Sequence, residues 1–262
     1  MADTRPSQDV ALGPRFVDAI KKRGGTLALS ILSEGEFCGL TDLKQAVAAE
    51  EFVDAIQPQL YFMEFNAFSV LQREDELMTG KTGDAPDSDR SLLDTYCSHP
   101  LATSTRFSTA GFFSDAVRKH DELRSIVSGM AQNALLGIER LRERIVVESD
   151  LRRKTRNPFA DVAKRPTATL ALLRALINEQ MKDLSQAPNE NDAIDLLHAV
   201  VPGAYCEYVL LDKKWCHRMR VAKTQLRQAG VKAPLAICFS KANVERFLTT
   251  LENTDQQRPA PV

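Results

Sequence analysis

Several features that would mark a membrane, secreted or zinc-binding protein are missing from this sequence. No apolar run reaches the roughly 18 residues that a membrane helix needs, and the polar start "MADTRPSQD" does not resemble a signal peptide. There is no CxxC pair, and the adjacent Cys216 and His217 are poorly spaced to bind one zinc ion. The five cysteines are scattered and odd in number, which suits reduced thiols. We therefore expect a cytoplasmic protein that binds neither a membrane nor zinc.

A large excess of either charge is missing as well. The chain carries 34 basic and 35 acidic residues, so a polyanionic partner would have to be attracted by a local basic patch. There is no GxSxG elbow of a serine hydrolase, and "TGKTGD" lacks the GxxxxGK(S/T) spacing of a phosphate-binding loop. What remains is an ordinary globular composition, 44% hydrophobic over 262 residues, which is long enough to bury a substantial core.

Short apolar segments alternate with helical patterns at both ends of the chain. The predicted strands cover residues 26–30, 60–65, 208–211 and 234–240, and a helical pattern follows each of them. This alternation predicts an α/β fold in which helices cover a parallel sheet. An α/β core is thus expected from the two ends of the chain, with a helical region between them.

The predicted domain boundaries follow from this pattern. The core would consist of residues 1–79 and 186–252, interrupted by a helical insertion or subdomain at residues 80–185, and residues 253–262 would form a disordered tail. Because ligands of open α/β sheets bind beyond the carboxyl ends of the strands, residues that directly follow a strand are the first candidates for function.

Carboxylates occupy several of these positions. Glu34 and Glu36 follow the first predicted strand, and Asp212 follows the third. Asp192 and Asp195 lie three residues apart on the preceding helix, so both project from one face of its first turns. We expect these acids to lie close together at one edge of the sheet.

Such a cluster would require a cation. Two like charges 4 Å apart repel by roughly 4 kcal/mol at an effective dielectric constant of 20, and an all-oxygen ligand set favours Mg²⁺ or Mn²⁺. Divalent ions held by carboxylates are a common device for cleaving phosphodiesters. The alternative is local: Asp192 as a first-turn acid of its helix, and Asp212 as the N-cap of the helix that follows.

Two stretches resemble the PIN-like nuclease superfamily. "LALSILSEGEF" is similar to the superfamily's second acidic motif, and "DAIDLLHAV" with "YCEYVLLDKKW" is similar to the third and fourth. The resemblance covers about residues 13–77 and 189–250. It implies a metal-dependent ribonuclease that cleaves RNA or single-stranded nucleic acid, as a toxin or defence effector by analogy. The implied ligands of Mg²⁺ or Mn²⁺, which would also be the catalytic residues, are Glu36, Asp195 and Asp212, with Asp192 assisting or replacing Asp195.

One motif of the superfamily has no counterpart here. Its first acid ends a strand that precedes the first helix, whereas only "MADTRPSQDVAL" precedes that helix in this chain. Either the original first strand lies upstream of this sequence, or it has been lost. A second copy or a partner chain could then complete the sheet. The alternative function is a catalytically inactive PIN-like module for nucleic-acid binding or assembly.

Basic residues gather in two places that could bind a phosphate backbone. Lys/Arg clusters neutralise phosphates, and aromatic side chains stack on unpaired bases. The predicted nucleic-acid-binding residues are Arg152, Arg153, Lys154, Arg156, Lys213 and Lys214, with Arg218 and Arg220 nearby. The alternative for the first cluster is a solvated turn between helices. Trp215 is expected in the core, and His198 is more readily explained as a buried structural residue than as part of a site.

Overall fold

The computed structural model describes residues 8–35, 43–57, 59–83, 85–86, 111–148, 167–182, 185 and 187–253. Helices dominate this part of the chain, and the strands are three residues long each. The elements are α1 (Gln8–Arg23), β1 (Leu27–Leu29), α2 (Ile31–Gly35), α3 (Leu43–Ile56), β2 (Leu60–Phe62), α4 (Ala67–Met78), α6 (Phe112–Arg118), α7 (His120–Val147), α9 (Ala168–Lys182), α10 (Glu190–Tyr205), β3 (Tyr208–Leu210), α11 (Lys213–Gln228), β4 (Ile237–Phe239), the 3-10 helix η3 (Lys241–Asn243) and α12 (Val244–Asn253).

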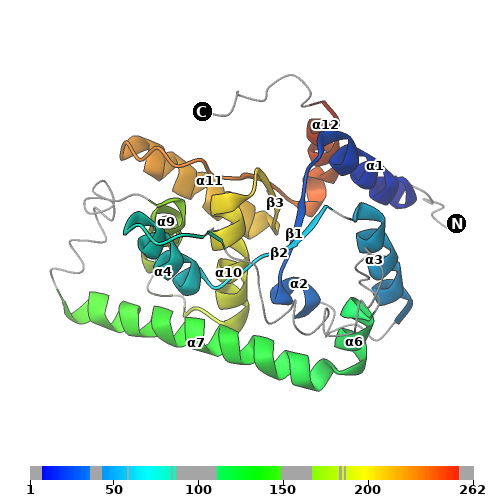
Figure 1. Cartoon of the computed structure of the whole chain (residues 1–262). Coiled ribbons are helices and arrows are strands. Elements are labelled where there is room, and N and C mark those ends of the chain that lie inside the picture. Colours follow the sequence, from blue (N-terminus) through cyan, green and yellow to red (C-terminus); the bar gives the residue numbers. More distant parts are fainter. Residues whose placement is uncertain are drawn as a thin grey trace, which may run out of the picture.

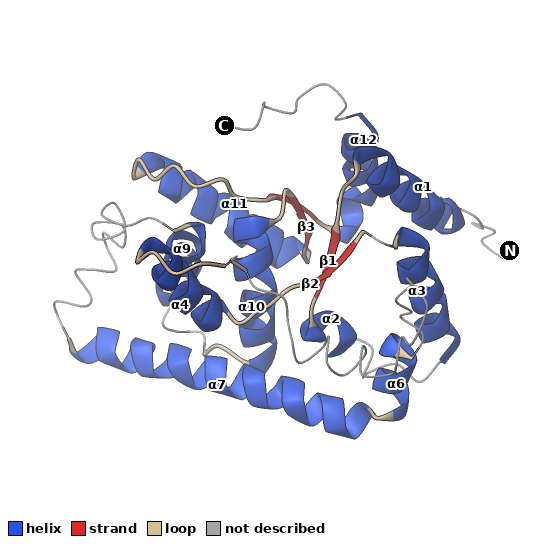
Figure 2. Cartoon of the chain, in the orientation of Figure 1, coloured by secondary structure: helices blue, strands red, loops and turns tan. Residues whose placement is uncertain are grey.

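The strands lie near the centre of the molecule and helices surround them (Figures 1 and 2). The long helix α7 runs along one side, and the first and last helices, α1 and α12, pack together on the other. Within the described ranges, no helix combines the length and apolar character needed to cross a bilayer.

The described strands form two parallel pairs. β1 pairs with β2 in the register Leu27 to Leu60, and β3 pairs with β4 in the register Tyr208 to Ile237. Parallel strands connected by helices agree with the predicted α/β fold, but the single sheet that was expected is replaced by two two-stranded sheets. As a result, the strand before Glu36 and the strand before Asp212 belong to different sheets.

A helix that looks continuous in the sequence is divided in two. The pattern over residues 112–147 predicts one helix, yet α6 ends at Arg118 and α7 begins at His120. The start of α6 is also held by a tertiary contact that local periodicity does not reveal. Buried Glu50 of α3 accepts a hydrogen bond from the backbone N–H of Ser114 at 2.6 Å, in the first turn of α6, which holds α6 against α3.

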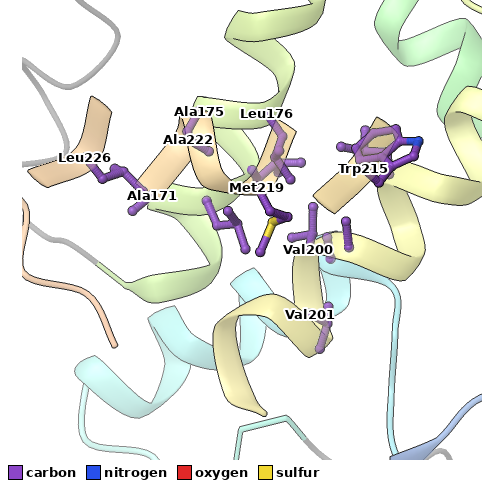
Figure 3. Packing of buried hydrophobic residues seen from close by; sticks show 14 of the residues in the cluster. Ala171, Ala175, Leu176, Val200, Val201, Trp215, Met219, Ala222 and Leu226 are labelled. Atoms are coloured by element: carbon purple, nitrogen blue, oxygen red, sulfur yellow. The ribbon is translucent and has the colours of Figure 1, made fainter. Parts of the chain in front are cut away.

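The largest hydrophobic cluster lies between α9, α10 and α11 (Figure 3). Leu172 and Leu176 of α9 are fully buried there, together with Val200 of α10 and Met219 of α11. Trp215 is 1% exposed, which confirms its predicted place in the core. Helix α9 lies within the predicted insertion, and it packs directly against α4, α10 and α11.

A glycine allows these helices to approach closely. A Cβ atom at Gly203 of α10 would lie 2.6 Å from Cε of Met219 and 2.7 Å from Cδ2 of Leu172. Both distances are far shorter than a van der Waals contact, so only glycine fits without a shift of the neighbouring side chains. Alanine at this position would therefore require the ends of the Met219 and Leu172 side chains to move.

Candidate functional site

Asp212 stands between β3 and α11 and caps the helix. Its Oδ1 atom accepts a hydrogen bond from the backbone N–H of Trp215 at 2.6 Å, and its backbone is extended. The side chain satisfies one of the N–H groups that the first turn leaves without a partner. The local explanation for this strand-end acid, that of an N-cap, is the one that the geometry bears out.

Asp192 and Asp195 lie in the first turns of α10, as predicted. The helix is capped by Asn189, whose Oδ1 accepts from the backbone N–H of Asp192 at 2.9 Å. The Oδ1 atom of Asp192 contacts Lys214 Nζ at 2.5 Å and Arg218 Nη1 at 3.3 Å. Both cations come from α11, so Asp192 joins the starts of two core helices.

The environments of the two aspartates affect their ionisation in opposite directions. Burial opposes ionisation of Asp192, but the hydrogen bond and charge of Lys214, together with Arg218, outweigh it and lower its pKa. The pKa of Asp195 is raised, first by burial and then by the negative charge of Asp212, while the Trp215 side chain acts against this rise. The charges of Asp192 and Asp212 therefore both act on Asp195.

The fourth predicted ligand cannot be placed in this neighbourhood. Glu36 lies outside the described residues, as do Arg152, Arg153, Lys154 and Arg156. Among the residues that are described, no three acidic, histidine or cysteine side chains gather as candidate metal ligands.

The acids present do not fit a resident Mg²⁺ or Mn²⁺ ion well. Oδ1 of Asp192 already contacts an ammonium and a guanidinium group, and Oδ1 of Asp212 accepts a backbone N–H. These cations supply the compensation that carboxylates in a metal site obtain from the ion. In the described structure, the protein itself therefore neutralises Asp192, whereas Asp195 gains no comparable compensation.

Helix α11 carries basic residues on two of its faces. Lys214 and Arg218 face α10, and the Arg218 guanidinium lies 4.6 Å from the centroid of the Trp215 ring. The other face presents Lys213, Arg220 and Arg227, all exposed, which we call the basic stripe. These three residues are spaced seven positions apart, which places them on one side of the helix over a length of about 21 Å.

No acidic residue of the described chain pairs with the basic stripe. Within the described residues, the one side-chain hydrogen bond of these three runs from Arg220 Nε to the Cys216 carbonyl of the same helix, over 3.3 Å. His217 and Thr224 lie between the cations on the same face. As far as the described residues show, the stripe is a local positive charge without acidic partners, on a chain whose net charge is −1.

The stripe was predicted only in part. Lys213 belongs to it, whereas Lys214, the other predicted nucleic-acid-binding residue of α11, is engaged with Asp192. Arg227 was not among the predicted residues, although its distance of seven residues from Arg220 could have revealed it. His198, expected to be structural, has its pKa lowered by burial to about 4 and is therefore neutral near pH 7.

Comparison with protein-family models, with curated proteins and with solved structures finds no match to this chain.

Proposed function

We propose that this protein is a non-catalytic nucleic-acid-binding module that binds RNA or single-stranded nucleic acid through α11. The observation that carries the proposal is the basic stripe, which is exposed and has no acidic partner among the described residues. Free Lys and Arg side chains bind phosphates by displacing condensed counterions. The bidentate geometry of arginine favours phosphate in particular, and two of the three stripe residues are arginines.

The arrangement of the acids supports this function. Asp192 and Asp212 lie near the start of α11, where uncompensated carboxylates would repel a phosphate backbone. Lys214 and Arg218 compensate Asp192, and Asp212 accepts the Trp215 N–H. These contacts reduce the repulsion between this end of the helix and a phosphate backbone. The positive charge of the basic stripe then determines the local electrostatic potential.

The test is fluorescence anisotropy with a labelled single-stranded RNA, repeated over a range of salt concentrations. Replacing both Arg220 and Arg227 by glutamine should weaken binding and flatten the salt dependence. We expect the slope of log K against log salt to fall by about 0.7 for each phosphate contact removed. The matched control is Arg144→Gln on α7, because Arg144 is exposed and already paired with Glu148. Equal affinity of wild type and the double variant would reject the proposal.

The second candidate is the metal-dependent nuclease that the PIN-like resemblance implies. It is favoured by Asp195, which burial and two neighbouring carboxylates make harder to ionise, a strain that a bound cation relieves. Titration calorimetry with Mn²⁺ distinguishes the two candidates. A saturable site that is lost in Asp195→Asn, together with metal-dependent RNA cleavage, would favour the nuclease, whereas RNA binding without a Mn²⁺ site favours the module.

A further inference from the structure

A second possible ligand site lies away from α11, in an open cavity of about 740 Å³. It is formed by α4, α9, the end of α10 and the segment that leads into β4. Its walls are largely apolar, with Leu77, Pro234 and Leu235 among them, and two carboxyl groups, those of Glu74 and Glu207, also line it. Within the described part of the chain, no lysine, arginine or histidine lines this cavity.

Glu74 is unusual because it is 6% exposed and has no cationic partner in the described structure. Its Oε1 atom accepts two hydrogen bonds of 2.6 Å, from the hydroxyl groups of Thr169 and Tyr205. Its Oε2 atom is buried and, within the residues described, has no partner at all. One of the two oxygen atoms of the buried Glu74 carboxyl group therefore accepts no hydrogen bond from the described residues.

The hydroxyl groups around Glu74 cannot supply the missing charge. Burial and the Glu74 carboxylate both raise the pKa of Tyr205, so its phenol stays neutral and acts as a donor. Thr169 is fully buried and also neutral. A buried carboxylate with neutral donors on one oxygen and nothing on the other is stabilised by a cation placed against the free oxygen.

We propose that this cavity binds a small aliphatic amine, with its ammonium group on Glu74 and its methylene chain against the apolar walls. An ammonium group provides three N–H donors and a full positive charge, the two things that Glu74 lacks. Glu207, exposed and lining the same cavity, accepts the second ammonium group of a diamine. Two lining carboxylates exclude anions. This site is independent of the proposed nucleic-acid binding.

Titration calorimetry on the full chain with 1,4-diaminobutane, butylamine and 1-butanol tests this site. The diamine should bind best, butylamine more weakly, and the neutral alcohol not at all. Glu74→Gln should weaken binding of both amines by about tenfold or more, since it removes a charged hydrogen bond. Glu207→Gln should weaken binding of the diamine alone. The control is Glu190→Gln, because Glu190 is exposed on α10 and does not line the cavity.

A second pair of variants avoids the buried carboxyl group. Ile237 lines the cavity and is 50% exposed, so a polar residue there leaves the core intact. Ile237→Lys places a positive charge in the cavity and should abolish amine binding, whereas Ile237→Gln should retain it. Equal binding by these two variants, unchanged binding by Glu74→Gln, or no binding of either amine by the wild type would overturn the proposal.

Discussion

At the scale of single residues, an acid that follows a strand has two roles that the sequence alone does not separate. The resemblance proposed from the sequence would make Asp212 a metal ligand, and Asp212 also occupies the N-cap position of α11. Its hydrogen bond to the Trp215 N–H assigns the second role directly. Capping depends on one local contact, whereas a metal site depends on several distant residues, so the local role was the more predictable of the two.

Substitution at Asp212 can measure the capping role. Asp212→Ala removes the acceptor and should lower the free energy of unfolding by about 1 kcal/mol, the usual contribution of an N-cap side chain. Asp212→Asn keeps an acceptor oxygen and should leave stability nearly unchanged. Urea unfolding followed by circular dichroism gives both values. Similar losses in the two variants would show that the charge of Asp212, and not its cap, stabilises the fold.

Asp195 and Asp192 should affect the pH dependence of stability in opposite directions. The pKa of Asp195 is raised in the folded state, so the protonated side chain favours folding. This contribution to the free energy of unfolding is fully present below the unfolded-state pKa of about 3.9, and it is lost as pH rises through the folded-state pKa. Asp195→Asn should therefore stabilise the protein near neutral pH by about 0.5 kcal/mol. This gain should disappear as pH falls towards about 4.

Asp192→Asn is the matched comparison for this prediction. The folded-state pKa of Asp192 is lowered, so the ionised side chain favours folding. This contribution to the free energy of unfolding is present above the unfolded-state pKa, and it is lost as pH falls through the folded-state pKa. The variant leaves Lys214 and Arg218 without their carboxylate, and it should destabilise the protein at neutral pH. Urea unfolding over a pH series measures both variants. The same sign of change in the two would contradict the electrostatic account.

At the scale of elements, local patterns predicted helix ends more reliably than they predicted sheets. The structure shows Asp212 as the N-cap of α11, one of the two roles that the sequence left open, and this role depends only on neighbouring residues. The periodicity does not show the break between α6 and α7, and it does not show the contact of Glu50 with the first turn of α6, because Glu50 lies far away in the sequence. Strand pairing is also non-local, and periodicity cannot reveal which strands of three residues will pair.

The packing of α9 shows how much the central part of the chain contributes to stability. Leu176 is fully buried between helices, so Leu176→Ala should lower the free energy of unfolding by about 3 kcal/mol. Leu136 of α7 is 47% exposed, and Leu136→Ala should change the free energy of unfolding by less than about 0.5 kcal/mol. Urea unfolding of the two variants tests the difference. A small loss for Leu176→Ala would mean that α9 is only loosely attached.

At the scale of the whole molecule, the sequence predicts which acids lie near one another more readily than it predicts the function of those acids. The charges of Asp192 and Asp212 act on Asp195, but within the described residues the three aspartates do not gather as candidate metal ligands. Their partners were not foreseen, because Lys214 and Arg218 reach Asp192 only once two helices have packed. Such contacts depend on the angle between helices, which the sequence does not display.

The two ends of the described chain are joined. Arg15 of α1 binds Glu245 and Glu252 of α12, and beneath these ion pairs Phe16 stacks near Phe247. Phe16 also lies beside Phe52 of α3, with 5.7 Å between the ring centroids. Helix α1 is thus held by one helix that follows it closely in sequence and by another at the far end of the described residues. Loss of the α12 contact alone would leave the α3 side of α1 covered.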